Sequence, residues 1–219
     1  MPMFDKSQNH YYSFNIGNMH FASFSFDAIL DYPRVKAGML AWLEQDLKEA
    51  VANRKNQPWI IVYTHRPIYC SYTLRDDCIL NPTRFAEFDN LLQKYKVDLF
   101  VTGHIHSYER NLPIKNGTVA PFQVMPDDEE YNYIVNPSAP VFVVQGAAGQ
   151  HGEWGDPPAS YKVKPYNVKM DITYSYLSVR SSNSTHMLVE SFKSEDNTVN
   201  DFFYIIKSTD AQYANLPYY

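Results

Sequence analysis

The sequence predicts a single α/β domain in which buried strands alternate with amphipathic helices. Two short, nearly all-apolar segments, 59–63 and 97–102, are typical of strands that are buried on both faces. Each follows a segment, 37–53 or 85–95, whose apolar residues recur at helical spacing. Helix, strand and polar loop therefore occur twice in the same order, which indicates a layered sheet with polar groups at the strand ends.

The elements follow one another from the start of the chain. Segments 11–15 and 19–26 are rich in aromatic residues and flank a Gly-Asn turn, which predicts a β-hairpin. The first helix places its apolar side chains on one face and charged residues on the other. Asn81-Pro82 is typical of an N-cap followed by proline at the first helical position, so it predicts where the second helix begins.

The second half of the chain predicts a different kind of structure. Segment 119–140 contains four prolines and an acidic run, so we expect a long surface excursion there. Segment 141–145 is a further buried strand. Segments 173–180, 185–192 and 199–207 are separated by polar turns and predict an antiparallel meander.

Composition excludes two classes of partner. The net charge of −5 over 219 residues leaves no basic surface for a nucleic acid. No stretch approaches the roughly 18 apolar residues of a membrane span, and the first residues lack the pattern of a signal peptide.

Other features point to a secreted or luminal location. Asn116 and Asn183 each begin a sequon for N-glycosylation in a polar, turn-like stretch. Cys70 and Cys78 are the only cysteines, and they are either joined in a local disulfide or remain two free thiols. A secreted protein without a signal peptide would have lost its N-terminal end.

The seven histidines divide into two groups. His10 and His186 are expected at the surface, His20 caps the hairpin or supports a site from behind, and His151 follows a glycine-rich turn near the site. His65, His104 and His106 differ because they directly follow the two buried strands, which brings them to one edge of the sheet.

The spacing of these three histidines favours metal binding. A neutral imidazole binds a metal through one nitrogen while the other donates a hydrogen bond. Gly103 is expected to let the backbone turn sharply, and in an extended segment His104 and His106 would point to the same side. Each would then serve one of two adjacent ions, with His65 joining one of them.

Segments 63–71 and 101–110, which contain these histidines, resemble the last two of five sequence blocks in purple acid phosphatases, a group of calcineurin-like metallophosphoesterases. Segments 42–47, 146–149 and 183–203 also resemble this family, in the same order, so the resemblance covers essentially the whole chain. It implies that residues 1–219 are the C-terminal part of an αββα sandwich. It also implies hydrolysis of phosphomonoesters at acidic pH.

The resemblance further implies a dinuclear metal centre and a ligand set. His65 and His104 would bind a divalent ion, either zinc, manganese or Fe(II), and His106 would bind Fe(III). Two such ions polarise phosphoryl oxygens and lower the pKa of a bound water. The family's loop between the two cysteines implies a Cys70–Cys78 disulfide beside His65.

The sequence departs from the family in its other ligands. Two aspartates, a tyrosine and an asparagine lie in G-D-x-G, G-D-x-x-Y and G-N-H blocks, and none of these strings occurs in the 219 residues. The segment 17–20 has Gly and Asn but no adjacent His. Where some plant members carry a histidine pair for the substrate, this chain has Leu74 and Arg75.

These departures leave two functions open. The first is a phosphomonoesterase completed by a missing N-terminal segment or a complementary chain, with the buried strands 59–63 and 97–102 left uncovered when that part is absent. The second is an inactive truncated chain or pseudoenzyme that acts as a structural or binding partner. Phosphodiesterase or pyrophosphatase activity is a further alternative within the same superfamily, and the sequence does not separate it from monoesterase activity.

Overall fold

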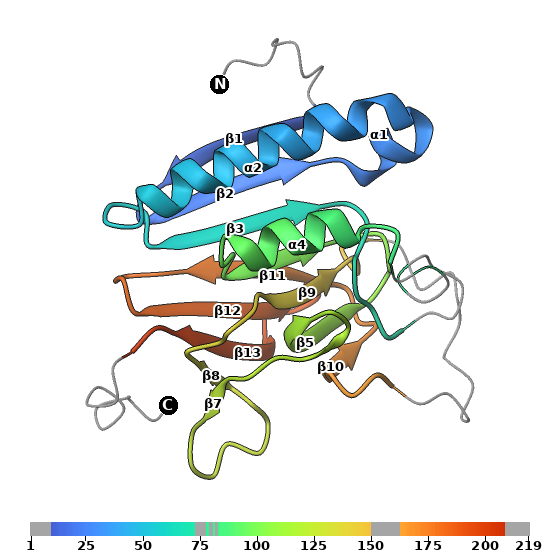
Figure 1. Cartoon of the computed structure of the whole chain (residues 1–219). Helices are drawn as coiled ribbons and strands as arrows, with labels where there is room; N and C mark the ends of the chain where they lie inside the picture. Colours follow the sequence, from blue (N-terminus) through green and yellow to red (C-terminus); the bar gives the residue numbers. More distant parts are fainter. Residues whose placement is uncertain (1–9, 73–77, 79–80, 82, 150–162, 209–219) are drawn as a thin grey trace.

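The computed structural model describes residues 10–72, 78, 81, 83–149 and 163–208 of the chain (Figure 1). The helices are α1 (Phe26–Asp31), the 3₁₀ turn η1 (Pro33–Val35), α2 (Lys36–Ala52) and α4 (Ala86–Lys94). The strands of the first half are β1 (Tyr11–Ile16), β2 (Met19–Phe24), β3 (Trp59–Thr64), β4 (Leu99–Thr102), β5 (Tyr108–Lys115) and β6 (Thr118–Val119). Those of the second half are β7 (Gln123–Val124), β8 (Tyr133–Val135), β9 (Val141–Gln145), β10 (Asn167–Asp171), β11 (Ser175–Arg180), β12 (His186–Lys193) and β13 (Val199–Ile206).

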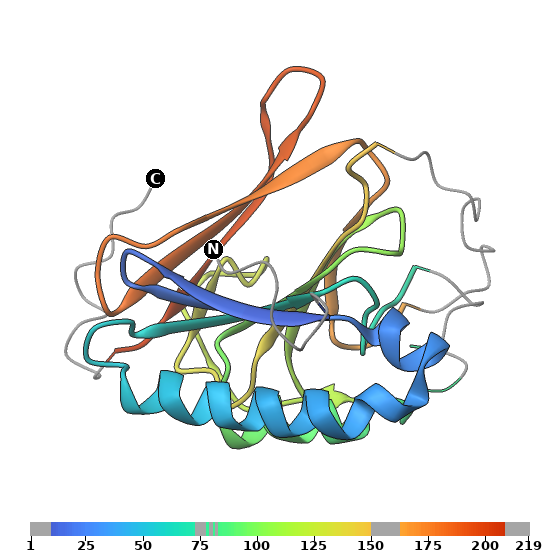
Figure 2. The ribbon, with the colours of Figure 1, turned by 90° about the horizontal axis from the view of Figure 1, so that it is seen from above.

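Two sheets and a layer of helices form the fold. The first sheet has the order β1-β2-β3-β4-β9-β5-β10, and the second has the order β11-β12-β13-β8-β7. Figure 2 shows α2 and α4 together on one side of the first sheet, with the second sheet on its other side. The predicted mixed α/β architecture is confirmed, and three of the four layers of the expected sandwich are present within the described residues.

Strand β3 shows why the first sheet is buried on both faces. Ile60 and Val62 pack into the core under the helices, whereas Trp59 and Ile61 pack into the core between the two sheets. Side chains alternate between the faces of a strand, so a strand buried on both faces must be apolar at every position. The continuous apolar run in the sequence is explained by this placement.

Helix α2 covers the first sheet as its spacing predicts. Met39, Leu43, Leu47 and Ala50 are its buried residues, and they recur every three or four positions. Val51, which the same periodicity predicts on the buried face, is 38% exposed at the end of the helix. Helix α4 begins at Ala86 with Phe85 as its N-cap, so the predicted N-cap at Asn81 is wrong. Pro82 lies outside the described residues.

The central strands run parallel and are paired on both sides. Strand β3 pairs with β2 and β4, and β4 pairs with β3 and β9, all in parallel. The prediction that these two strands have uncovered edges is therefore wrong, because the aromatic hairpin β1-β2 lies outside β3 and the three strands β9, β5 and β10 lie outside β4.

The prediction for segment 119–140 is also wrong in part. Strands β7 and β8 lie within it, and Ile134 and Val135 of β8 are fully buried. Strand β8 pairs in parallel with β13, so it extends the antiparallel meander β11-β12-β13 that the sequence predicts correctly. Two and three residues are too few for periodicity to reveal a strand.

Candidate metal centre

The histidines lie where two parallel strands end side by side. Thr64, the last residue of β3, is in register with Thr102, the last residue of β4. His65 and Gly103 therefore follow at the same height, and the Gly103 amide donates to the His65 carbonyl at 2.9 Å. His65 Nε2 and His104 Nδ1 face each other at 3.1 Å. The two imidazoles therefore lie together at one edge of the sheet, as the sequence predicts.

The segment from 103 to 107 is a series of tight turns and not the extended stretch that the sequence predicts. The Ile105 amide donates to the Gly103 carbonyl at 2.8 Å, and the Ser107 amide donates to the Ile105 carbonyl at 2.7 Å. The residue in the left-handed region is His104, with φ of 67°. A non-glycine residue in that region is uncommon and such strain concentrates at functional sites.

A glycine is required nearby, but it is Gly146 and not Gly103. A Cβ on Gly103 would make only ordinary contacts, the nearest 3.7 Å from His65 Nδ1. A Cβ on Gly146 would lie 1.9 Å from the Ile105 carbonyl oxygen. The Gly146 amide also donates to the Ser107 carbonyl at 3.0 Å. Gly146, which directly follows β9, thus allows close packing against the loop that carries His104 and His106.

His106 contributes a buried nitrogen atom. Its Nδ1 makes no hydrogen bond with any of the residues that the structure describes. A buried polar atom without a partner costs free energy, and a metal ion is one of the groups that satisfies such an atom. The described residues nevertheless contain no cluster of three His, Cys, Asp or Glu side chains that would hold one ion.

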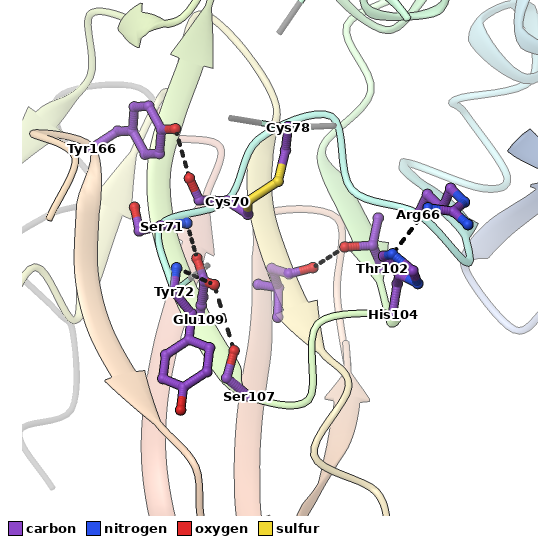
Figure 3. Close-up of a disulfide and its surroundings, with 11 residues drawn as sticks. Arg66, Cys70, Ser71, Tyr72, Cys78, Thr102, His104, Ser107, Glu109 and Tyr166 are labelled. Carbon is purple, nitrogen blue, oxygen red and sulfur yellow. Dashed lines mark hydrogen bonds between the residues drawn. A yellow bond between two sulfur atoms is a disulfide. The ribbon is translucent and has the colours of Figure 1, made fainter. Parts of the chain in front are cut away.

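Arg66 determines which tautomer the paired histidines adopt. Its Nη1 atom lies 3.0 Å from His104 Nε2 (Figure 3). Its Nε donates to Asp27 Oδ1 at 2.7 Å. Because arginine can only donate, His104 Nε2 accepts, and its Nδ1 carries the proton that points to His65. Metal binding through His104 Nδ1 would reverse this tautomer and would require Arg66 to turn away.

The spacing of the pair fits a shared ion. Zinc–nitrogen bonds of about 2.0–2.1 Å at a tetrahedral angle separate two ligand nitrogens by about 3.3 Å. The observed separation of 3.1 Å between His65 Nε2 and His104 Nδ1 is close to that value. Two imidazoles thus fit one divalent ion, and the described residues supply no carboxylate beside them.

A buried carboxyl group and a disulfide lie beside this edge. Glu109 is fully buried and its oxygens accept from the amides of Ser71 and Tyr72 at 2.6 and 2.9 Å (Figure 3). Burial raises the pKa of Glu109 to about 7, although the two amides and the Ser107 hydroxyl oppose that rise. Cys70 and Cys78 are joined in a disulfide with a Cα separation of 5.7 Å, as the resemblance implies.

The strand that follows the histidines joins the two sheets. Arg110 donates from Nε and Nη2 to both oxygens of Asp201 in β13, at 2.8 and 3.0 Å, and the Tyr108 hydroxyl donates to Asp201 at 2.7 Å. Sequence reasoning gave no role to Glu109, Arg110 or Asp201. Tyr108, Glu109 and Arg110 directly follow the histidines in the sequence. Because side chains alternate along a strand, a strand there would place Glu109 on one face and Tyr108 and Arg110 on the other, and this is the signal that could have found them.

The remaining predicted residues lie apart from this edge or outside the described residues. His20 bonds across the hairpin to Asn15 at 2.8 Å and to Asp46 of α2 at 2.9 Å, so it is a structural residue. Asn116 and Asn183 are exposed. His186 lies on β12, near the second sequon. His151, Leu74 and Arg75 lie outside the described residues.

None of the helices in the described part of the chain is long and apolar enough to cross a membrane.

Comparisons with known proteins agree with this fold. The sequence profile of the calcineurin-like phosphoesterase family matches residues 2–108, and that of the iron/zinc purple acid phosphatase-like protein C matches residues 139–202. Mouse acid phosphatase type 7 is 34% identical over 209 residues, which cover 90% of this chain and 46% of the mouse protein. A probable inactive purple acid phosphatase of Arabidopsis thaliana is 31% identical over 159 residues, which cover 71% of this chain and 24% of that protein.

A solved structure extends the similarity to three dimensions. A purple acid phosphatase from yellow lupin seeds superposes with a TM-score of 0.73 at 25% identity, over 90% of this chain and 33% of that chain. The chain thus spans less than half the length of these relatives. The family profiles, the relatives and the solved structure all point to the same family. The chain belongs to the purple acid phosphatases among the calcineurin-like phosphoesterases.

Proposed function

We propose that this chain contributes the histidine ligands of a dinuclear metal centre that hydrolyses phosphomonoesters at acidic pH. The observation that carries the proposal is the 3.1 Å approach of His65 Nε2 and His104 Nδ1 at the end of two parallel strands. His65 and His104 would hold the divalent ion, either zinc, manganese or Fe(II), and His106 would hold Fe(III). The ions would polarise the phosphoryl oxygens and supply a water of lowered pKa.

The chain's own residues would orient and confine these ligands. Gly146 lets the strand end of β9 pack against the loop of His104 and His106, and Arg66 holds the pair in one tautomer until it turns away. The carboxylate ligands would come from outside these 219 residues, from a preceding segment of the same polypeptide or from a complementary chain. Support for this comes from the missing aspartate blocks and from the 46% coverage of the mouse relative.

A secreted or luminal location follows from the same proposal. The Cys70–Cys78 disulfide and the two exposed sequon asparagines, Asn116 and Asn183, suit an oxidising compartment. Both asparagines would carry glycans in protein from its native source, which mass spectrometry of the glycopeptides would detect.

A second candidate function is a non-catalytic binding or structural partner. The Arg66 guanidinium beside His104 favours it, because a cation next to a ligand opposes metal binding. A probable inactive purple acid phosphatase among the relatives is also compatible with it.

The test is to measure bound metal and aryl phosphate hydrolysis at acidic pH for residues 1–219. We expect at most one divalent ion per chain and no robust turnover, because two cations need a bridging carboxylate. Co²⁺ binding should be lost in His65→Ala and His104→Ala and retained in His186→Ala. Turnover with two metals bound per chain would contradict the proposal that the carboxylate ligands come from outside these 219 residues. Co²⁺ affinity unchanged by the first two substitutions would contradict the ligand assignment.

A further inference from the structure

Glu109 is the most completely enclosed carboxyl group near the candidate metal centre. None of its surface is exposed, and it lies three residues after His106 at the start of β5. Its Oε2 accepts from the Ser71 amide at 2.6 Å, its Oε1 accepts from the Tyr72 amide at 2.9 Å, and the Ser107 hydroxyl lies 3.5 Å from Oε1. Burying a carboxyl group costs free energy unless such donors compensate for the lost water.

These bonds connect the two segments that carry the histidines. Ser71 and Tyr72 belong to the loop that follows His65, and Glu109 belongs to the strand that follows His106. Figure 3 shows the Glu109 side chain reaching from β5 to the backbone of this loop, beside the disulfide. Cys70 of the same loop makes different contacts, since it is bonded to Cys78 and its carbonyl accepts from the Tyr166 hydroxyl at 3.0 Å.

The geometry requires two acceptor atoms. Two amide donors converge on one side chain, and only a carboxyl group of this length offers two oxygens to them. A glutamine would accept one amide and present its own NH₂ group to the other. One buried donor would then face a donor, which costs more than the loss of an exposed hydrogen bond.

We propose that Glu109 is a positioning residue of the candidate metal centre, where it holds the loop after His65 against the strand after His106 and so fixes the relative placement of the histidines. This inference rests on the proposed function, because the placement matters only if the histidines bind metal. Glu109 acts through backbone amides and itself contacts no ligand nitrogen in the described contacts.

The test compares Glu109→Gln with Glu190→Gln in the complete chain without metal. Glu190 is also buried, lies in the second sheet and pairs with Arg180, so it is a matched control at a distance. The amides of Ser71 and Tyr72 should exchange with solvent about 10- to 100-fold faster in Glu109→Gln, as expected when a buried donor loses its acceptor.

Histidine resonances separate positioning from a merely structural role. In ¹⁵N-histidine-labelled protein, the imidazole signals of His65, His104 and His106 should move in Glu109→Gln, while those of His20 and His186 stay in place. Faster amide exchange with unmoved His65 and His104 signals would overturn the proposal. If the glutamine variant does not fold, Glu109→Asp retains both oxygens on a shorter stem, and the same two readouts apply with the same overturning result.

A Co²⁺ titration distinguishes failure of this inference from failure of the proposed function. We expect Glu109→Gln to weaken Co²⁺ binding about tenfold relative to the unsubstituted chain, and Glu190→Gln to leave it unchanged. Equal affinity in all three proteins would overturn the positioning role. Absence of Co²⁺ binding to the unsubstituted chain would contradict the proposed function, while the imidazole signals would still decide the positioning role.

Discussion

The two ends of strands β3 and β4 are built from opposite kinds of contact. At the amino end, Asp98 is buried and bonds to Arg54 at 2.9 Å, to Lys207 at 2.8 Å and to the Ile60 amide at 2.8 Å. Lys207 also lies over the Trp59 ring at 4.1 Å. At the carboxyl end, the imidazoles of His65 and His104 lie against each other and against the Arg66 guanidinium. The buried Nδ1 of His106 has no hydrogen-bond partner among the described residues.

The difference indicates that the amino ends of β3 and β4 contribute to stability, whereas their carboxyl ends contribute to function. The amino end compensates its charges with partners from the strands and loops around it, as expected for a structural cluster. The carboxyl end carries imidazole nitrogens with lone pairs and a His104 backbone in the left-handed region. No carboxylate ligand lies beside these nitrogens within the described residues. Ligands at the carboxyl ends of parallel strands are a general property of open α/β sheets.

The largest expected effect comes from breaking the amino end. Asp98→Ala would leave Arg54 and Lys207 without their shared carboxylate and the Ile60 amide without an acceptor. We expect unfolding in urea to be easier by about 3 kcal/mol, at the lower end of the range for a buried pair because both cations are partly exposed.

Two results would test this assignment. Asp196→Ala removes an exposed aspartate that accepts from the amide and the hydroxyl of Thr198 in its own turn, and it should change stability by less than about 0.5 kcal/mol. Co²⁺ binding should be the same in both variants and in the unsubstituted chain. Loss of Co²⁺ binding in folded Asp98→Ala would contradict the separation of the two ends.

The pH dependence of stability should distinguish the ends next. Burial raises the pKa of Glu109 to about 7 from its usual 4.5, so its contribution is fully present below pH 4.5 and is lost as pH rises through 7. Burial lowers the pKa of Lys207 to about 8 from its usual 10.5, although Asp98 opposes this. The folded state therefore gains stability from Lys207 as pH rises from 8 towards 10.5.

For these two groups together, stability should be lowest between pH 7 and 8 and higher on both sides. The free energy of unfolding should rise by about 2 kcal/mol on the acidic limb, below pH 7, and by about the same on the alkaline limb, above pH 8, after a discount for the partly exposed Lys207. Urea unfolding at pH 5, 7.5 and 9.5 would measure both limbs. Glu109→Gln should remove only the acidic limb and Lys207→Met only the alkaline limb. Equal slopes in variant and unsubstituted protein would contradict the two assignments.

The sequence predicted the regular parts of the fold and missed those that depend on long-range pairing. Strands β3 and β9 are apolar except at their last residues, Thr64 and Gln145, and were predicted almost to the residue, because burial on both faces leaves a continuous signal. Strands β8 and β10 are short, and β10 alternates weakly, so only their pairing with β13 and β5 defines them. Local periodicity does not contain that information.

The same limit applies to the candidate site. The two strand ends could be predicted because their histidines are adjacent in sequence to apolar runs. The Glu109 contact with Ser71 spans 38 residues, and the Gly146 contact with Ile105 spans about 40, so neither leaves a local pattern. The left-handed conformation of His104 was missed because the sharp turn was expected at Gly103 and the residues after it were expected to be extended.

The last prediction concerns the contact between Gly146 and Ile105. Gly146→Ala would place a Cβ 1.9 Å from the Ile105 carbonyl oxygen, which is backbone and cannot rotate away. The loop of His104 and His106 must shift, and we expect a loss of about 2 kcal/mol, within the usual cost of overpacking. Co²⁺ binding should weaken with it. Gly38→Ala is the matched control, because it lies in α2 with open space around its Cβ and should stabilise by about 0.5–1 kcal/mol. Unchanged Co²⁺ binding in a destabilised Gly146→Ala would show that the loop geometry is not what holds the histidines together.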